Sequence, residues 1–238
     1  MCGRKTLTKD AQAIIEELLV DEWEQKDEYN PSYNIAPTQY SPILIYNNNR
    51  KIEHMRWGLV PSWAKDKAIG AKMINARGET LLEKPSFKNL VSSNRCIVIT
   101  DGYFEWQNIG TTKTPHYFHN PEKKILPMAG LWDEWQSANG ELMKTYTVIT
   151  ITPKPEYAHI HNRMPVILPH SVIDVWVKTG EYSPTAALDH VLPYRDELEV
   201  YPVSTFVNSP KKLCDRCLGK DRRIFPYSCA GSCPSLSR

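Results

Sequence analysis

The sequence predicts an α+β protein with a strongly curved, barrel-like and mainly antiparallel β-sheet core and a few flanking helices. Many short segments rich in β-branched and aromatic residues alternate with turn residues, which is typical of antiparallel strands. Few segments have the apolar spacing of a helix. The 18 prolines among 238 residues favour short elements joined by rigid loops. Many short strands of this kind commonly form a barrel or a curved sheet.

The first part of the chain contains one predicted helix and two predicted strands. Residues 9–25 predict a helix capped by Thr8. The apolar residues of this segment recur near helical spacing at Ile14, Leu18 and Trp23. Residues 29–42 are rich in Pro, Asn and Tyr and predict a loop. Residues 43–60 predict two strands joined by an Asn-rich turn.

The remainder of the body consists mainly of predicted strands. They cover residues 95–100, 102–107, 115–120, 126–135, 144–152 and 196–204. A short helix is expected to begin near Pro155. Residues 169–180 predict another helix, which ends at Gly180 because glycine commonly terminates helices.

Composition indicates one large body followed by a different kind of segment. Hydrophobic residues make up 41% and charged residues 24%, as in ordinary globular proteins. No apolar run approaches the ~20 residues that span a membrane, and the first residues lack a signal peptide's apolar stretch. We therefore expect a cytoplasmic, nucleoid-associated protein with reduced thiols and no membrane contact. The predicted domains are a body at 1–210 and a basic, Cys-rich tail at 211–238.

Charge is distributed unevenly between these two parts. Residues 211–238 hold seven Lys or Arg and two Asp, whereas residues 1–210 hold 22 basic and 25 acidic residues. A generally basic surface therefore does not indicate nucleic-acid binding by the body. Such binding would depend on a few placed arginines.

Cys2 is the first candidate for chemistry, because removal of Met1 would give it a free α-amine beside its thiol. The amine can form a Schiff base with an aldehyde, and the thiol can then add to the imine and close a thiazolidine ring. Both groups titrate near neutral pH in model compounds. A second possibility is an N-terminal-nucleophile amidase, in which the α-amine acts as base. A small residue at position 2 also occurs without any function.

Two polar segments could assist such chemistry. In "MINARGET", Asn75 could orient an aldehyde oxygen or a hydroxyl, and Arg77 could hold a phosphate. In "DGYFEWQ", Glu105 is expected on the strand face opposite Phe104 and Trp106. An aromatic setting tends to raise a carboxyl pKa, which suits a proton shuttle. The alternatives are a solvated turn for the first segment and an edge-strand glutamate for the second.

Two further segments contain candidate contacts. In "HIHNRMPVIL", His161 could pass a proton to a sugar oxygen, although a structural histidine is the alternative. Trp57 and Trp63 flank a Gly/Pro loop in "RWGLVPSWA" and could stack on unpaired bases or pack in the core. Zinc hydrolysis by His159, His161, Glu79 and Glu105 is only weakly indicated, because the His-x-His spacing is a weak signal and no HExxH motif is present.

Seven segments together resemble the SRAP (SOS-response-associated peptidase) family. They are "MCGR", "YNIAPTQ", "RWGLVPSWA", "INARGET", "DGYFEW", "HNRMPVIL" and "PVSTFVNSP", in the family's order from residue 1 to about 210. The resemblance implies that Cys2, after loss of Met1, traps the ring-opened aldehyde of an abasic site in single-stranded DNA as a thiazolidine crosslink.

The resemblance also implies roles for other residues. Asn75 would position the α-amine and the sugar, Glu105 would serve Schiff-base chemistry and crosslink turnover, and His161 would exchange protons with the sugar. The implied DNA contacts are Arg4, Arg77, Arg163 and Trp63. The core reaction would require no cofactor, and we expect a monomer. An alternative activity is a thiol autopeptidase that uses Cys2 without a DNA role, and lyase activity is also expected.

The tail lies outside this resemblance. Its four cysteines, Cys214, Cys217, Cys229 and Cys233, have a spacing that suits a four-thiolate zinc knuckle. The surrounding basic residues would suit contact with nucleic acid. A flexible basic tail with free thiols and a zinc-dependent binding module are both open interpretations.

Overall fold

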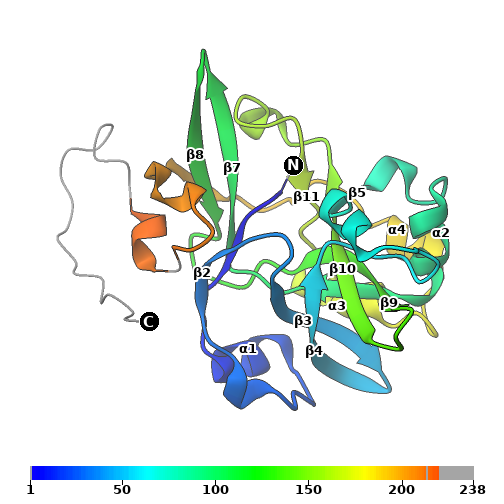
Figure 1. Ribbon diagram of the computed structural model, residues 1–238. Coiled ribbons are helices and arrows are strands. Elements are labelled where there is room, and N and C mark those ends of the chain that lie inside the picture. Colours follow the sequence, from blue (N-terminus) through cyan, green and yellow to red (C-terminus); the bar gives the residue numbers. More distant parts are fainter. Residues whose placement is uncertain (1, 213, 220–238) are drawn as a thin grey trace.

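The computed structural model describes residues 2–212 and 214–219, which form two β-sheets with short helices around them (Figure 1). The strands are β1 (Lys5–Leu7), β2 (Ser32–Ile35), β3 (Tyr40–Asn47), β4 (Asn49–Trp57), β5 (Asn75–Arg77), β6 (Arg95–Val98), β7 (Gly102–Ile109), β8 (Thr112–His119), β9 (Met128–Gln136), β10 (Leu142–Ile151), β11 (Met164–Pro165) and β12 (Glu199–Pro202). The α-helices are α1 (Ala11–Leu18), α2 (Pro85–Ser93), α3 (Ile173–Val177) and α4 (Pro184–Leu188). The 3-10 helices are η1 (Lys26–Glu28), η2 (Lys67–Lys72), η3 (Gly78–Thr80), η4 (Pro155–Tyr157), η5 (His170–Val172), η6 (Thr205–Asn208) and η7 (Asp215–Leu218).

Five strands close into a barrel in the order β10, β4, β3, β6 and β9, because β9 pairs back onto β10. Every neighbouring pair in the barrel is antiparallel except β10 with β4. Strands β5 and β11 pair with the later residues of β10. The predicted α+β class with a barrel-like, mainly antiparallel core is confirmed.

All four residues of β6 are buried, which shows that the barrel is covered on its outer side as well as filled inside. Helices α2 and α3 contact β6, and α2 also contacts β9. The indole of Trp176 on α3 donates to the backbone oxygen of Cys96 at 2.9 Å. The guanidinium of Arg95 donates to the backbone oxygens of Val91, Trp176 and Tyr182, which satisfies a buried charge with fixed carbonyl dipoles.

The second sheet has the order β12, β8, β7, β1 and β2 and is antiparallel throughout. Its hairpin of β7 and β8 projects beyond the rest of the molecule (Figure 1). Gly102 is the first residue of β7, and a Cβ at this position would lie 2.2 Å from the hydroxyl oxygen of Tyr117. The glycine in "DGYFEW" therefore permits the close approach of β7 to β8.

The two faces of β7 enter different hydrophobic clusters. Tyr103 packs in the main core, whereas Phe104 belongs to a smaller cluster that includes part of the predicted tail. The other buried members of the smaller cluster are Tyr117, Val203, Val207 and Cys217. Glu105 therefore lies on the Tyr103 face of the strand, as the alternating pattern predicts.

Some element boundaries differ from the sequence-based expectations. The first helix ends at Leu18 because Leu19 adopts a left-handed conformation with φ of 51°. Its cap is Asp10, whose side chain accepts from the backbone of Ala13, so the prediction of Thr8 as the cap is wrong. Thr8 instead donates to Asp101 through both its backbone N–H and its hydroxyl.

Two other segments also depart from their predictions. The predicted loop at residues 29–42 contains β2, which pairs with β1 through long-range backbone contacts that local composition does not show. The predicted helix at 169–180 is shorter, and α3 ends at Val177 before Gly180. Helix α2, which begins at Pro85, was not predicted.

Within residues 2–212 and 214–219, no helix is long and apolar enough to cross a membrane.

Candidate functional site

Cys2 lies three residues before the start of β1, and its side chain is fully buried. Strand β1 is held between β2 and β7, with Lys5 opposite both Ile35 and Tyr103. The side-chain nitrogen of Asn75 donates to the backbone oxygen of Cys2 at 2.9 Å. Asn75 is in turn positioned by β5, which pairs in parallel with β10 of the barrel. The structure thus connects the start of the chain to the barrel through Asn75.

The side-chain amide oxygen of Asn75 is a further feature of the site. Its Oδ1 is buried and has no hydrogen-bond partner among the described residues. A buried amide oxygen is costly to leave unsatisfied. Because Asn75 already holds the carbonyl of Cys2, this free acceptor is available to an N–H or O–H group that enters the site.

Glu105 lies close to His161, and its charge acts on the thiol of Cys2. The Nδ1 of His161 is 3.9 Å from Oε1 of Glu105. Burial raises the pKa of Glu105 to about 7, and the positive charge of the chain's amino terminus acts in the opposite direction. Burial also lowers the pKa of His161. Glu105 can therefore exchange a proton near neutral pH, and the lowered pKa of His161 favours its neutral ring.

Two backbone groups of Arg163 contact Nδ1 of His161. The backbone N–H of Arg163 lies 3.0 Å from Nδ1, and its backbone oxygen lies 3.2 Å from the same atom. Nδ1 accepts from the N–H when the ring proton is on Nε2, and it donates to the backbone oxygen when the proton is on Nδ1.

The Cys2 thiol is protonated at neutral pH. Burial raises its pKa to about 12, and the charge of Glu105 adds to the rise. A thiol in this state is a poor initial nucleophile, because the thiolate is the reactive form. The site is therefore better suited to a reaction in which an amine attacks first and the thiol follows with proton transfer.

A cavity of about 430 Å³ opens beside these groups. It is lined by Glu105, Trp106, Asn108, Lys113, His161 and Asn208. Its volume lies in the range of about 300–1,000 Å³ that is common for small-molecule sites. Two of the four predicted chemical residues thus line one cavity, and Asn75 and Cys2 meet next to them.

The predicted DNA contacts fall into two groups. Arg77 and Trp63 are exposed, and Trp63 retains 61% of its accessible surface. Trp57, the other tryptophan of that loop, is completely buried, and its indole donates to the backbone of Ile74. Trp57 is therefore a core residue, whereas Trp63 is a surface residue.

Arg4 and Arg163 are engaged within the protein. Arg4 donates from Nη1 to the side chain of Asn34 and to the backbone of Val207, both at 2.7 Å. Arg163 makes a two-pronged ion pair with Glu79 at 2.7 and 2.8 Å and also donates to the backbone oxygen of Thr150. Groups of the protein therefore already use much of the donor capacity of Arg4 and Arg163. DNA contact by these two arginines stays a prediction.

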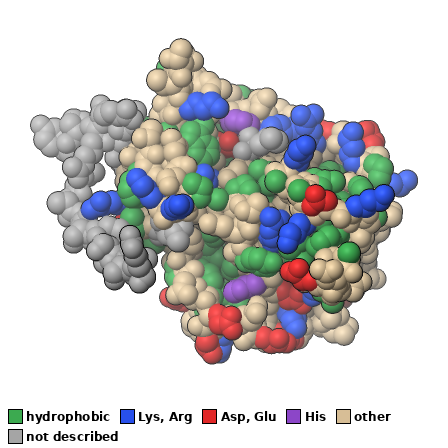
Figure 2. All heavy atoms as spheres, viewed as in Figure 1, with side chains coloured by type: hydrophobic (Ala, Val, Ile, Leu, Met, Phe, Trp, Pro, Cys, Tyr) green, Lys and Arg blue, Asp and Glu red, His purple; other side chains and the backbone are tan. Residues whose placement is uncertain are grey.

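Charge separates across the face shown in Figure 2. Basic side chains spread over its upper half, whereas acidic side chains gather mainly toward its lower edge. Figure 1 places β7, β8 and β5 in the upper half and α1 in the lower part. Strands β5, β7 and β8, two of which carry Asn75 and Glu105, therefore lie toward the more basic part of this face, which suits a polyanion.

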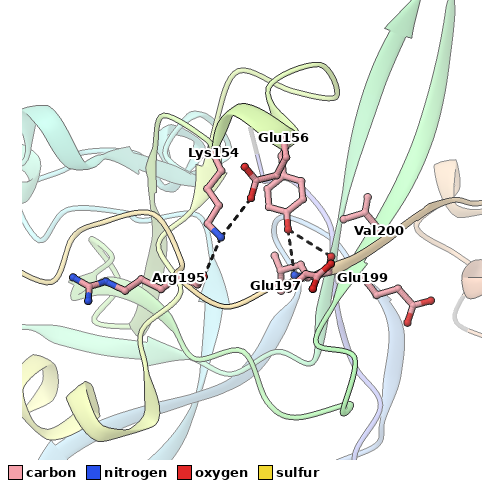
Figure 3. Close-up of a pocket in the computed structure, with 8 residues that line it drawn as sticks. Lys154, Glu156, Arg195, Glu197, Glu199 and Val200 are labelled. Atoms are coloured by element: carbon pink, nitrogen blue, oxygen red, sulfur yellow. Dashed lines mark hydrogen bonds and ion pairs between the residues drawn. The ribbon is translucent and has the colours of Figure 1, made fainter.

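A second hollow, of about 610 Å³, has a different lining (Figure 3). Three glutamates, Glu156, Glu197 and Glu199, line it together with Lys154 and Arg195. The Lys154 ammonium donates to the backbone oxygen of Arg195 at 3.1 Å and lies 3.5 Å from a carboxylate oxygen of Glu156 (Figure 3). Because three carboxylates line it and the Lys154 ammonium is already paired, this hollow is a poorer anion site than the smaller cavity.

Comparison with known proteins decides the family. The family model described as SOS response associated peptidase (SRAP) matches residues 1–210. The chain belongs to the SRAP family. The solved structure of a protein from Bacteroides thetaiotaomicron superimposes with a TM-score of 0.79 at 26% identity, covering 89% of this chain and 97% of that chain.

Two relatives within the family carry functional names. The Bacillus subtilis (strain 168) protein named abasic site processing protein YoaM is 42% identical over 214 residues, covering 89% of this chain and 94% of the relative. The Gallus gallus protein named abasic site processing protein HMCES is 34% identical over 230 residues, covering 83% of this chain and 68% of the relative. The likeness therefore extends over most of this SRAP chain.

The predicted zinc ligands are divided by the limits of the described chain. Cys214 and Cys217 are described, whereas Cys229 and Cys233 lie outside the described residues. Cys217 is fully buried, and its thiol donates to the backbone oxygen of Lys212 at 3.2 Å. In the part of the chain that the structure describes, no three His, Cys, Asp or Glu side chains form a metal-binding group. Zinc binding by the tail of this SRAP protein stays a prediction.

Sequence reasoning missed two buried polar residues near the site. Asn34 is fully buried, and its side-chain nitrogen donates to the backbone oxygens of Val207, Ser209 and Lys212. Its place inside the "YNIAPTQ" segment was the available signal. Lys5 is also fully buried, and its amine donates to the backbone oxygen of Ile99 at 3.0 Å. Nothing in the local pattern distinguishes this lysine from a solvated one.

Proposed function

We propose that this SRAP protein processes abasic sites by forming a covalent thiazolidine crosslink between Cys2 and the ring-opened sugar in single-stranded DNA. The names of YoaM and HMCES support the substrate class. The observation that carries the proposal is the meeting of Cys2 with Asn75, Glu105 and His161, which come from four separate segments. The proposal requires the α-amine of Cys2 and therefore the removal of Met1, a residue outside the described range.

The first step joins the amine to the aldehyde. The nitrogen of Cys2 attacks the aldehyde carbon, a C–N bond forms, and the carbonyl oxygen leaves as water to give a Schiff base. The carboxylate form of Glu105 accepts a proton from the attacking amine, and its carboxylic acid form returns one to the departing hydroxyl. The unsatisfied Oδ1 of Asn75 supplies an acceptor that orients the amine for this attack.

The second step closes the ring. The sulfur of Cys2 adds to the imine carbon, a C–S bond forms, and the thiol proton ends on the imine nitrogen. A thiol pKa of about 12 means that deprotonation accompanies the addition and does not precede it. The imidazole of His161, which lies next to Glu105, can exchange a proton with a sugar oxygen and take part in ring opening and reversal.

Single-stranded DNA would reach the site across the basic part of the surface. Arg77 and Trp63 are the exposed candidates, the first for phosphate and the second for stacking on an unpaired base. Few such contacts imply a modest affinity that falls with salt, with a slope that scales with the number of phosphates contacted. The covalent bond to the lesion's sugar would then account for most of the retention of the protein on the DNA.

The direct test uses a single-stranded oligonucleotide with one abasic site. The purified protein is expected to give an adduct that survives denaturing electrophoresis, and Cys2→Ala is expected to give none. Cys96→Ala is the matched control, because Cys96 is the other fully buried cysteine of the body. Intact mass first establishes that Met1 has been lost. Absence of an adduct from protein lacking Met1 would refute the proposal.

The alternative is a thiol peptidase that acts on its own amino terminus. The family description contains the word peptidase, which is the only support for this activity. A fully buried thiol with a raised pKa is poorly prepared for direct attack on a peptide bond. Cys2-dependent loss of Met1 in a cell-free synthesis without methionine aminopeptidase would favour it.

A further inference from the structure

The hydroxyl of Tyr103 is a buried polar group that neither proposed reaction step uses. Tyr103 retains 1% of its accessible surface, and its hydroxyl has no hydrogen-bond partner among the described residues. Tyr117, Tyr146 and Tyr157 are also buried, but each of their hydroxyls has a partner, at 3.0, 3.0 and 3.2 Å respectively. A buried hydroxyl without a partner lowers stability, which a protein tolerates most readily where the group serves its function.

Tyr103 extends from β7 toward the candidate site. Because side chains alternate along a strand, Tyr103 and Glu105 lie on the same face of β7, two residues apart. Tyr103 is also opposite Lys5 of β1 and belongs to the same core cluster as Cys2. The charges of Cys2 and Glu105 both act on the Tyr103 hydroxyl. The hydroxyl without a partner therefore lies in the neighbourhood of the thiol and the carboxyl group of the site.

The ring of Tyr103 is held in place without any ligand. It stacks on Phe118, its partner across β7 and β8, with the ring centres 4.7 Å apart and the ring planes 12° from parallel. Phe118 in turn contacts the ring of Tyr157 edge-on, with the ring centres 5.6 Å apart. A donor fixed in this way needs little reorganisation during a reaction.

The hydroxyl is a donor because it keeps its proton. Burial, together with the nearby charges of Cys2 and Glu105, holds the pKa of Tyr103 well above its ordinary value. It can therefore stabilise a negative charge that forms beside it.

The sulfur of Cys2 is the group in the site that lacks donors for such a charge. Burial raises the pKa of its thiol, and the backbone N–H of Arg4, which bonds the sulfur, acts in the opposite direction. Glu105 already has His161 and the positive charge of the amino terminus as neighbours for its own charge. A second donor at the sulfur would stabilise the charge that develops there as the thiol loses its proton.

We propose that Tyr103 is a catalytic residue of ring closure, in which its hydroxyl donates a hydrogen bond to the sulfur of Cys2 as the C–S bond forms. The inference rests on the proposed function and adds a residue to its second step. The S–H bond breaks, the C–S bond forms and the proton reaches the imine nitrogen, while the O–H bond of Tyr103 stays intact. The same hydrogen bond would stabilise the departing sulfur when the ring reopens.

The experiment compares wild type with Tyr103→Phe, which removes the hydroxyl and keeps the stacked ring. Each protein is mixed with a single-stranded oligonucleotide that contains one abasic site, and cyanoborohydride is added at the start or after a delay. The hydride reduces the Schiff base to a stable amine but leaves the thiazolidine unchanged, and intact mass distinguishes the two products by the added hydrogen atoms. Cys2→Ala marks complete trapping, because it can form the Schiff base but cannot close the ring.

Tyr103→Phe is expected to close the ring about tenfold more slowly, because one hydrogen bond to a developing charge is lost. A larger share of its early adduct is then reduced by the hydride, whereas its Schiff base forms at the wild-type rate. Its midpoint in urea unfolding is expected to equal or exceed that of wild type, because the substitution removes a hydroxyl that has no partner.

Tyr146→Phe is the matched control. Tyr146 is fully buried in the same core, but its hydroxyl is bonded to Ser41. This variant is expected to unfold at lower urea concentration and to close the ring at the wild-type rate.

Three results would overturn the inference. The first is ring closure by Tyr103→Phe at the wild-type rate, and the second is equal slowing by Tyr146→Phe. The third is slower formation of the Schiff base in Tyr103→Phe, which would place the hydroxyl at Glu105. Failure of the proposed function is recognised separately, because wild type would then form no adduct, and the inference would fall with it.

Discussion

Lys5 allows a quantitative test of how burial next to the site affects stability. Its side chain is fully buried, and burial lowers the pKa of its amine from the ordinary 10.5 to about 7. Cys2 and Asp101 act in the opposite direction but do not cancel the effect. Asp101 itself accepts hydrogen bonds from Thr6 and Thr8. The folded protein therefore contains a buried amine that loses its proton more easily than the unfolded chain does.

The sign and size of the effect follow from proton linkage. Between pH 7 and 10.5 the unfolded chain keeps the Lys5 proton and the folded protein has lost it, so wild-type stability rises with pH in this window. At pH 7 the burial of Lys5 costs on the order of 4 kcal/mol. Lys5→Met removes this cost but also removes the hydrogen bond to Ile99, worth about 1 kcal/mol. We expect the variant to be more stable by about 3 kcal/mol at pH 7 and roughly equal to wild type at pH 9.5.

Urea unfolding at the two pH values measures this difference directly. Lys26→Met serves as the control, because Lys26 is exposed and its substitution should have the same small effect at both pH values. The reasoning is refuted if the stability difference between Lys5→Met and wild type does not change with pH.

Three further outcomes are expected. Glu105→Gln should remove the inflection near pH 7 that we expect in the wild-type crosslinking rate, since the carboxylate that accepts a proton forms as pH passes about 7, and it should leave the separate rise that comes from deprotonation of the α-amine at about pH 8; an inflection near pH 7 in the variant's pH–rate profile would assign that proton transfer elsewhere. Asn34→Ala should lower the free energy of unfolding by about 2–4 kcal/mol, because it leaves several backbone oxygens and Arg4 without their partner; a loss below about 0.5 kcal/mol in urea unfolding would contradict this. Glu79→Gln should release Arg163 and steepen the salt dependence of binding to a single-stranded oligonucleotide by about one phosphate contact, whereas an unchanged slope would make Arg163 a structural residue.

Local sequence patterns predicted the strands better than the helices. Alternating apolar residues and an Asn-rich turn located β3 and β4, and the β7 alternation placed Glu105 on the Tyr103 face. The first helix was predicted too long, because apolar spacing continues past Leu18 while the backbone turns left-handed at Leu19. Strand β2 was missed because its pairing with β1 depends on residues far away in the chain.

The candidate site shows the same division between local and long-range information. The sequence identified Cys2, Asn75, Glu105 and His161 through their motifs, but not their distances. It also identified Arg4 and Arg163 as cations without showing that protein acceptors hold them. Lys113 and Asn208 were not singled out, because only the folded hairpin and η6 bring them to one cavity.

The sequence by itself determined the fold class, the family and the residue types available for chemistry, because strand alternation, turn residues and motif spacing are properties of neighbouring positions. The tertiary structure decided which groups are buried and therefore how they ionise. The pKa of Cys2 rises to about 12, that of Glu105 rises to about 7 and that of Lys5 falls to about 7, in each case chiefly because burial removes water from the charged form. Desolvation depends on every atom packed around a group, and most of those atoms belong to residues distant in the chain.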